Sequence, residues 1–341
     1  MTQVSDFYYE LPQELIAQEP LSDRSASRML VVSRESQSFT DDCFANFHTY
    51  VRSGDCLVLN NTRVFPARLH GRRNTESGAS LEVFLLRAQD AKEKIWNVLI
   101  KPAKRMHVGD RILFRDDFCC EVLSQRDFGE HVVEFSAGEP MRDFLERLGE
   151  MPLPPYIRRK PAPADRERYQ TVFAEKRGSI AAPTAGLHFT QEMIDRCRAA
   201  GADIAYITLH VGLGTFAPLR ERKLADIQLH EEYFEISESN ASLMRKATRL
   251  LCVGTTSVRT IETALLRGGF CEMSGETNLF IYPGFRFRGT GAMMTNFHLP
   301  QSSLLMLVCA FAGRDLTLAA YRHAVAARYR FFSYGDCMLM L

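Results

Sequence analysis

Apolar and polar residues alternate along short runs between about residues 67 and 137, and glycine-containing turns separate the runs. The apolar runs of this segment lie at residues 80–86, 95–100, 111–114, 119–123 and 131–135. Alternation with a period of two is typical of strands that bury one face. Because no helical pattern separates these runs, they predict a small antiparallel barrel or sandwich, followed by a helix over residues 141–148.

A proline-rich stretch at residues 151–156 ends this pattern, and strand–turn–helix units follow it. Strands are expected at residues 30–32, 56–59, 179–183, 203–211, 249–253 and 293–297. Helices are expected at residues 191–200, 302–312 and 316–329, with a further one that ends at Gly268. Thr190 is placed to cap the first of them. Such alternation is typical of an α/β fold, with a mixed or parallel sheet and helices on both faces.

The two patterns together predict the domain organisation. We expect a discontinuous α/β catalytic domain made of residues 1–65 and 150–341. Residues 66–149 would form an inserted, antiparallel β-barrel-like domain that interrupts it.

Composition narrows the class of protein. Of the 341 residues, 46% are hydrophobic and 24% are charged, which is the balance of a globular protein. The net charge of +1 excludes binding of nucleic acid through bulk charge alone. The longest apolar run, residues 304–312, is far shorter than a membrane span, and residues 1–10 do not resemble a signal peptide, so no membrane is expected.

The cysteines and histidines argue against a metal centre. The nine cysteines are scattered, without a C-x-x-C pair, which is typical of reduced thiols in a cytoplasmic protein. No H-E-x-x-H motif and no Cys/His cluster with metal-ligand spacing occurs in the sequence. We therefore expect no metal site.

Four loops share one construction, in which a strand runs into glycine and hydroxyl residues. They lie at residues 181–190, 209–216, 253–259 and 295–303. In α/β sheets ligands bind beyond the carboxyl ends of strands, and free amides at helix starts favour anions. Each loop alone is also explained as a helix cap or a tight turn. Four of them in one half of the chain favour a ligand site.

Titratable side chains in these loops are the candidates for chemistry. His188, His210 and His298 lie in three of them, and imidazole can move protons near neutral pH. Glu232 would serve as a base or accept hydrogen bonds from hydroxyls, although a solvated carboxylate at a strand edge is the simpler interpretation.

Two further patterns leave alternatives open. Residues 212–217 match the dinucleotide fingerprint loosely, but Pro218 follows at once, which argues against that site. The linker is basic, and its string at residues 154–160 pairs an aromatic ring with three cations. This combination, Tyr156, Arg158, Arg159 and Lys160, suits RNA binding, and a solvated basic linker is the alternative.

Long strings of this sequence resemble one known family. They include residues 6–12, 54–60, 61–69, 151–157, 280–284, 295–300 and 334–336, and above all the string AAPTAGLHFT at residues 181–190. In order and over nearly the whole chain, they resemble the S-adenosylmethionine:tRNA ribosyltransferase-isomerase family of queuosine biosynthesis. The chain departs from the family's pattern at Asn61, Ile227, Glu276, Gly291 and Gln301.

The resemblance implies a fold and an activity. The fold is an α/β domain interrupted by a β-barrel. The activity transfers and isomerises the ribosyl group of S-adenosylmethionine onto the aminomethyl-7-deazaguanine at the wobble position of a tRNA. The products are epoxyqueuosine in the tRNA, adenine and methionine. S-adenosylmethionine is then a cosubstrate, no cofactor is tightly bound, and the expected partner of this monomer is a tRNA anticodon stem-loop.

Site residues follow on the same basis. We expect His210 and His298 to carry protons, with His188 behind them, and Glu232 to hold the ribose hydroxyls. The residues expected to bind the cosubstrate are Thr184, Gly186, Gly212, Gly214, Thr215, Gly254, Thr255, Thr256, Arg259 and Asn296. The alternatives are an S-adenosylmethionine-dependent RNA methyltransferase and a dinucleotide-binding oxidoreductase.

Overall fold

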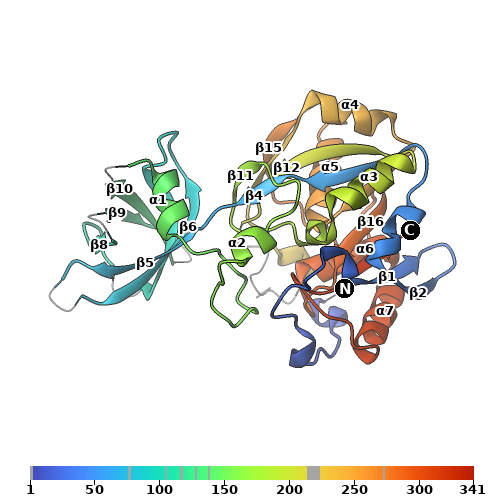
Figure 1. Cartoon of the computed structure of the whole chain (residues 1–341), viewed down its shortest axis with the longest axis horizontal. Coiled ribbons are helices and arrows are strands. Elements are labelled where there is room, and N and C mark those ends of the chain that lie inside the picture. Colours follow the sequence, from blue (N-terminus) through green and yellow to red (C-terminus); the bar gives the residue numbers. More distant parts are fainter. Residues whose placement is uncertain are drawn as a thin grey trace. The chain divides into compact units, whose positions relative to one another are not determined.

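The structure is a computed structural model that describes residues 3–75, 78–103, 106–115, 118–126, 129–136, 139–212, 223–271 and 273–341. The chain divides into two compact units (Figure 1). The first unit comprises Met1–Arg63, Pro154–Arg159 and Glu167–Leu341, and the second comprises Val64–Leu153 and Lys160–Arg166. The domain boundaries expected from the sequence stay a prediction.

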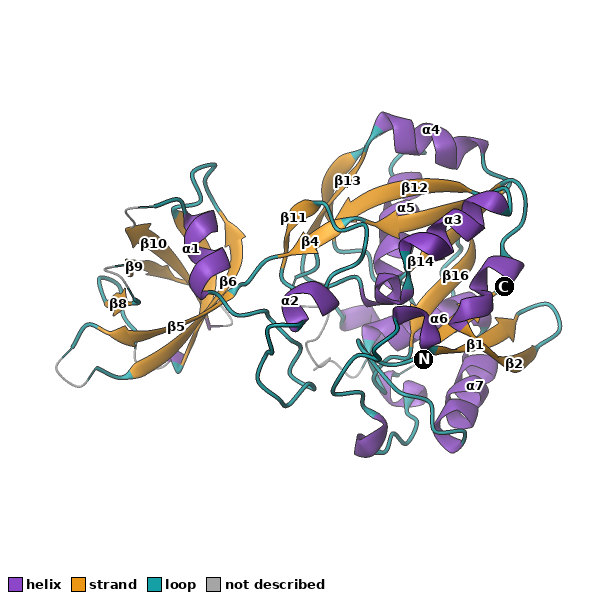
Figure 2. Ribbon diagram, viewed as in Figure 1, coloured by secondary structure: helices purple, strands orange, loops and turns teal. Residues whose placement is uncertain are grey.

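A mixed sheet is the frame of the first unit (Figure 2). Within the described residues its order is β15-β13-β12-β3-β14-β16-β17-β1-β2. The strands are β1 (Arg28–Ser33), β2 (Ser38–Cys43), β3 (Asp55–Asn60), β12 (Asp203–Leu209), β13 (Glu232–Ile236), β14 (Arg249–Val253), β15 (Ser274–Thr277), β16 (Thr290–Asn296) and β17 (Cys337–Met340). The central strands β12, β3, β14 and β16 run parallel, so their carboxyl ends share one edge of the sheet.

Helices cover both faces of this sheet. They are α3 (Gln191–Ala199), α4 (Glu238–Lys246), α5 (Thr255–Leu266), α6 (Ser303–Ala312) and α7 (Arg314–Ala326). Every residue of β3 is buried, as expected of a parallel strand with both faces covered. Val58 joins the core under α5, whereas its neighbours Leu57 and Leu59 join the core under α3.

The second unit is built on a closed antiparallel barrel in the order β10-β7-β6-β5-β8-β9. Its strands are β5 (Arg68–Arg73), β6 (Ser80–Ala88), β7 (Ile95–Lys101), β8 (Arg111–Leu113), β9 (Cys119–Gln125) and β10 (Glu130–Ser136), and the helix α1 spans Met141–Leu148. On β7, the alternate residues Trp96, Val98 and Ile100 are buried. The predicted fold class, an α/β fold with helices on both faces and an inserted antiparallel barrel, is thus confirmed.

One predicted strand, at residues 179–183, is wrong. The strand β11 (Lys176–Ser179), which pairs with β4 (Thr62–Val64), ends where the prediction begins. The Ser179 hydroxyl donates to Ala181 O at 2.7 Å and accepts from Val211 N at 2.9 Å, which folds the chain into a turn. A 3₁₀ helix, Thr184–His188, follows Pro183. The remaining short helical segments are α2 (Asp165–Arg168) and the 3₁₀ helices Val4–Phe7, Gln13–Leu15, Arg24–Ala26, Phe44–Tyr50 and Leu224–Asp226.

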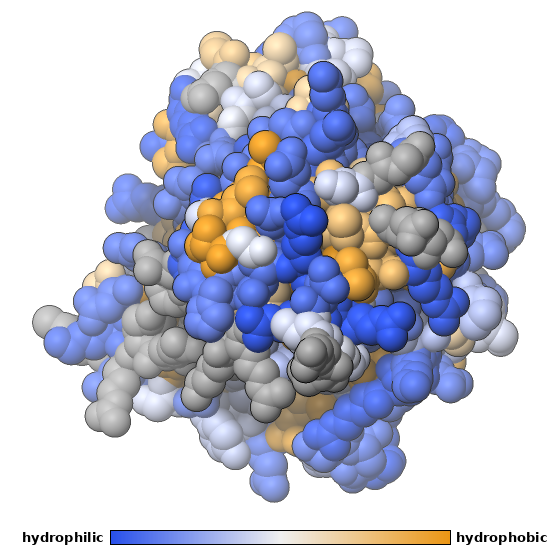
Figure 3. Space-filling model, turned by 90° about the vertical axis from the view of Figure 1, so that its left-hand side faces the viewer, coloured by the Kyte–Doolittle hydropathy of each residue, from blue (hydrophilic) through white to orange (hydrophobic). Residues whose placement is uncertain are grey.

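Among the described residues, no single helix is long and apolar enough to cross a membrane. The helices α6 and α7 reach the required length and apolar composition only together, and they are bent by 116° where they meet. On the face drawn in Figure 3, hydrophilic residues cover most of the described surface, and hydrophobic ones gather in small areas between them.

Candidate active site

A pocket of about 670 Å³, including space open to solvent, lies where the parallel strands β14 and β16 end. Its walls come from residues 182–185, 254–256 and 295–299, so three of the four loops singled out in the sequence meet there. Val211 adds the start of the fourth loop. The location is the one expected of a ligand site in an α/β sheet.

The expected site residues divide into those that line this pocket and those that do not. The ones that line it are Tyr156, Thr184, Gly254, Thr255, Thr256, Asn296 and His298. The described ones outside its lining are Arg158, Arg159, Lys160, Gly186, His188, His210, Gly212, Glu232 and Arg259. Gly214 and Thr215 lie outside the residues that the structure describes.

The first turn of α5 borders the pocket without a side-chain cap. Gly254, at φ 88°, turns the chain sharply from β14 into the helix, a conformation that favours glycine. The Thr256 hydroxyl is buried and has no hydrogen-bond partner among the described residues. The amides at the start of a helix lack partners within the helix and carry the positive end of its dipole. The pocket therefore offers an anion site beside an unused hydroxyl.

Asn296, at the end of β16, is oriented by its surroundings. Its Nδ2 donates to Phe332 O at 3.0 Å and to His188 Nε2 at 3.1 Å, and it lies 3.3 Å from Asp336 O. Because carbonyl oxygens only accept, the amide nitrogen has to face them. Its Oδ1 is left buried and without a partner among the described residues. The pocket thus has an acceptor available for an N–H or O–H group of a ligand.

The buried His188 lies behind Asn296. Its Nε2 accepts from Asn296, so its Nδ1 carries the hydrogen and donates to Ser27 Oγ at 2.8 Å. Burial lowers the pKa of His188 to about 3, and the charges of Arg330 and Arg24 act in the same direction. His188 is therefore neutral at neutral pH.

His298 lines the pocket on a firmly held backbone. Tyr9 Oη donates to its carbonyl at 2.5 Å, and its amide donates to Tyr321 Oη at 3.1 Å. The ring Nε2 lies 3.0 Å from Thr295 Oγ1. Burial lowers the pKa of His298 to about 3. Its imidazole is thus neutral at neutral pH.

His210 lies between β11 and β13. Its Nδ1 lies 2.8 Å from Thr62 Oγ1, and its ring stacks on Tyr233 with 5.9 Å between centroids. Gly178 leaves room for this ring, because a Cβ there would lie 2.6 Å from His210 Nε2. The structure therefore gives His210 a defined position, although not in the lining of the pocket.

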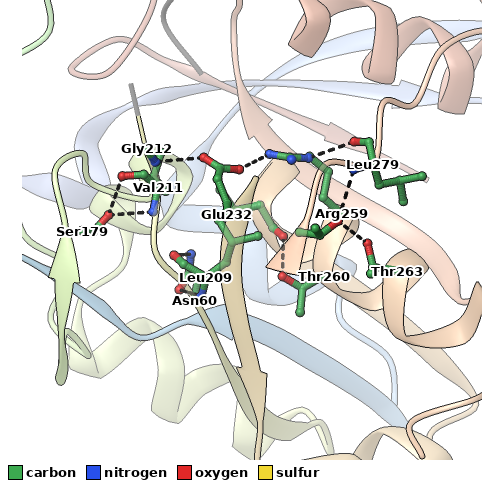
Figure 4. Close-up of polar contacts among 12 residues, drawn as sticks. Asn60, Ser179, Leu209, Val211, Gly212, Glu232, Arg259, Thr260, Thr263 and Leu279 are labelled. Carbon is green, nitrogen blue, oxygen red and sulfur yellow. Dashed lines mark hydrogen bonds and ion pairs between the residues drawn. The ribbon is translucent and has the colours of Figure 1, made fainter. Parts of the chain in front are cut away.

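Glu232 and Arg259 form a buried ion pair with each other (Figure 4). One carboxylate oxygen of Glu232 accepts from Arg259, and the other accepts from Gly212 N at 2.9 Å. Arg259 Nε also donates to Leu279 O at 3.1 Å. Both carboxylate oxygens of Glu232 are thus engaged within the protein, and the pair ties Gly212 to β13 and α5.

The residues expected to bind tRNA are engaged in different ways. The Tyr156 ring packs on Phe332, with 4.7 Å between centroids, and its hydroxyl lies 2.5 Å from Ser333 Oγ. Arg158 is exposed and donates to Gln13, and Arg159 Nε donates to Gln18 O at 3.0 Å. Lys160 belongs to the second unit.

Sequence reasoning missed Phe332 and Ser333 as pocket residues. They follow no glycine- and hydroxyl-rich loop, and they reach the pocket because β17 lies next to β16 in the sheet. Phe332 adopts a φ of 69°, which is rare for an aromatic residue and common at functional sites, but no sequence pattern reveals it. The described residues contain no group of three or more His, Cys, Asp or Glu that could hold a metal ion.

Comparisons with known proteins cover almost the entire chain. The model of the family described as "Queuosine biosynthesis protein" matches residues 4–340. The S-adenosylmethionine:tRNA ribosyltransferase-isomerase of Solibacter usitatus is 55% identical, covering 99% of both chains, and that of Caldanaerobacter subterraneus is 46% identical with the same coverage. The crystal structure of S-adenosylmethionine tRNA ribosyltransferase from Thermotoga maritima is similar, with a TM-score of 0.56 and 36% identity. That similarity covers 99% of this chain and 100% of the other.

Proposed function

Because the chain belongs to the family of queuosine biosynthesis proteins, we propose that the pocket at the ends of β14 and β16 is where it cleaves S-adenosylmethionine. The chain is an S-adenosylmethionine:tRNA ribosyltransferase-isomerase, a transferase that modifies tRNA. It transfers and isomerises the ribosyl group of its cosubstrate onto the aminomethyl-7-deazaguanine of the tRNA. The products are epoxyqueuosine in the tRNA, adenine and methionine.

The proposed place of the reaction rests on polar groups that line one pocket and have no hydrogen-bond partner among the described residues. The uncapped first turn of α5 suits the carboxylate of the methionine part, and Thr256 offers a hydroxyl beside it. The unpartnered Oδ1 of Asn296 suits an N–H or O–H donor of the adenosine part. Both kinds of group occur in S-adenosylmethionine, and leaving them unpaired when buried would be costly.

The chemistry is dominated by proton movement. The sulfonium acidifies the neighbouring 5′ carbon, from which a base removes a proton. The neutral amine of the deazaguanine attacks the ribose, adenine leaves with a proton, and methionine departs as the epoxide forms. His298 is neutral, lines the pocket and is the proposed proton acceptor. With a pKa of about 3 this imidazole is a weak base in the unliganded protein, so the proposed role rests on its place in the pocket.

His210 and Glu232 enter this proposal in supporting roles. His210 is the proposed second proton carrier, held by Thr62 and by the stacked Tyr233. Glu232 acts through the Gly212 amide that it binds, at the start of the fourth loop.

The partners and the setting are part of the same proposal. The tRNA enters through its anticodon stem-loop, with Arg158, Arg159 and Lys160 contributing cations near the backbone phosphates. The enzyme acts as a monomer. All nine cysteines are free thiols, which supports a reducing compartment such as the cytoplasm. The curated relatives are named as ribosyltransferase-isomerases, so neither the methyltransferase nor the oxidoreductase alternative is favoured.

Product analysis tests the proposed function. The wild-type protein is incubated with S-adenosylmethionine and an anticodon stem-loop that carries the aminomethyl-7-deazaguanine, and the products are identified by mass spectrometry. We expect adenine and methionine in equal amounts, together with an RNA that has gained the ribosyl-derived group. Release of S-adenosylhomocysteine with a methylated RNA would contradict the proposal.

A further inference from the structure

A second, smaller pocket adjoins the first one. It has a volume of about 280 Å³, including space open to solvent, and its polar lining includes Arg24, Ser27, Arg168 and His188. Ser333 lines both pockets. Asn296, in the first pocket, binds His188, in the second, so the two are connected by a direct hydrogen bond. We refer to the second one as the arginine pocket.

Backbone carbonyls hold the two arginines in place. Arg24 donates to Leu187 O at 3.1 Å and to Glu167 O at 2.9 Å. Arg168 donates to Ser22 O at 2.8 Å and to Leu21 O at 2.5 Å. The Arg168 Nε is buried and has no partner among the described residues. Both guanidinium groups are thus oriented before any ligand arrives.

The positive charge of this pocket is not neutralised by ion pairs. No carboxylate of the described residues forms an ion pair with Arg24 or Arg168. Asp23 lines the pocket, but its Oδ1 accepts from Ser25 N and Ser25 Oγ, each at 2.8 Å. Burial lowers the pKa of the Arg24 guanidinium, the nearby charge of Arg168 lowers it further, and the more weakly acting carboxylate of Glu167 raises it. Two close cations without a paired anion favour an anionic ligand.

A third cation adds to this charge. Arg330 donates to Glu19 O, and its Nη1 is buried without a partner among the described residues. The carboxylate of Asp336 accepts from the amides of Arg28 and Arg330 at 2.9 and 2.8 Å. Asp23 and Asp336 accept these hydrogen bonds from the chain, and their charges act on Arg168 and Arg330 without forming an ion pair.

A chain of hydrogen bonds gives the pocket one further donor. The Asn296 amide donates to His188 Nε2, so His188 Nδ1–H donates to Ser27 Oγ. Ser27, with 4% of its surface exposed, lines the pocket. Because its oxygen accepts from His188, its own hydrogen is left to donate to a ligand.

We propose that the arginine pocket binds a phosphate of the tRNA backbone close to the nucleotide whose base reacts in the first pocket. The inference rests on the proposed function. S-adenosylmethionine has no phosphate, whereas an RNA loop presents one for every nucleotide. Guanidinium N–H groups and the Ser27 hydroxyl are the donors that a phosphate prefers, and two adjoining pockets would hold neighbouring parts of one strand.

Binding measurements test the proposal without requiring turnover. The affinity of the wild-type protein for the stem-loop is compared with that of Arg24→Gln, Arg168→Gln and the control Arg322→Gln, an exposed arginine on α7. We expect about a tenfold loss for each pocket variant and none for the control. The plot of log affinity against log salt should flatten by about 0.7 for each lost contact with single-stranded RNA. The affinity for S-adenosylmethionine should stay unchanged.

A modified RNA distinguishes a backbone phosphate from free phosphate. A stem-loop with one neutral methylphosphonate linkage beside the modified nucleotide should bind the wild-type protein more weakly. The same linkage should cost Arg168→Gln less affinity, because this variant has already lost one contact with the phosphate. If the linkage weakens both proteins equally, while inorganic phosphate binds the wild-type protein only, the pocket takes free phosphate and the proposal is overturned.

Further outcomes keep the proposal separate from the proposed function. The phosphate site is overturned if the pocket variants have the RNA affinity and the salt dependence of the wild-type protein. It is also overturned if these variants bind S-adenosylmethionine more weakly while their binding of RNA is intact. If Arg168→Gln fails to fold, Arg168→Lys replaces it, because lysine retains the positive charge. This variant should bind RNA more weakly, with the same dependence of log affinity on log salt as the wild-type protein. If RNA binding responds as expected but the wild-type protein releases no adenine, the phosphate site stands and the proposed function fails.

Discussion

Substituting Glu232 by Gln should destabilise the first unit strongly. Only 4% of the Glu232 side chain and 6% of the Arg259 side chain are exposed, so the substitution leaves a guanidinium charge buried without its partner. Breaking a buried ion pair in this way costs about 3–5 kcal/mol. Gln at this position can still accept from Gly212 N, so the loss comes mainly from the charge. Replacing both partners, in Glu232→Leu with Arg259→Met, should cost much less.

Equilibrium unfolding in urea measures this effect. Far-UV circular dichroism follows α3 to α7 of the first unit, whereas the single tryptophan, Trp96, lies on β7 of the barrel and reports on the second. The matched control is Glu192→Gln, which breaks an exposed pair with Arg196 on α3 and should cost about 0.3–0.5 kcal/mol. The reasoning is refuted if Glu232→Gln costs no more free energy of unfolding than this control.

Three further variants give expected outcomes. Gly178→Ala places a Cβ 2.6 Å from His210 Nε2, so the imidazole has to move. We expect kcat to fall while the affinity for S-adenosylmethionine stays unchanged. An unchanged kcat would argue against a role of His210 in catalysis. His188 has a pKa of about 3 when folded and about 6.5 when unfolded, so its contribution to stability is present above pH 6.5 and is lost as the pH falls toward 3. The free energy of unfolding should therefore fall less steeply in His188→Gln than in the wild-type protein between pH 6 and 4, by up to about 1.4 kcal/mol per pH unit. The same slope in both proteins would contradict the burial of His188 as a neutral group. Replacing Arg158 and Arg159 by Gln should weaken RNA binding and flatten its salt dependence, and an unchanged slope places the RNA elsewhere.

Much of the fold is predictable from the sequence because its signals are local. The helix predicted at residues 141–148 has those bounds in α1, and β14 matches its prediction at residues 249–253. The strands that were not predicted lack such local signals. The strand β13, Glu232–Ile236, has a glutamate on its buried face, which weakens the alternating pattern. The strand β17, Cys337–Met340, is a buried run of four residues that becomes a strand only by pairing with β16 and β1.

The site was predictable as a set of loops, whereas its interactions were not. The glycine and hydroxyl residues at 254–256 indicate a helix start at a ligand site, and the structure has α5 beginning there. The pairing of Glu232 with Arg259 depends on how β13 and α5 are placed in the tertiary structure. The orientation of the Asn296 amide depends on the carbonyls of Phe332 and Asp336, which are remote in the sequence.

The rate of adenine release in a single turnover by His298→Ala tests the central claim most directly. The variant and the wild-type protein are mixed with saturating S-adenosylmethionine and stem-loop RNA, after both affinities have been measured separately. Because His298 lines the pocket as a neutral proton acceptor, we expect adenine release to slow by at least about a hundredfold with both affinities retained. Release at close to the wild-type rate would show that the reaction takes place without His298 and would contradict the account.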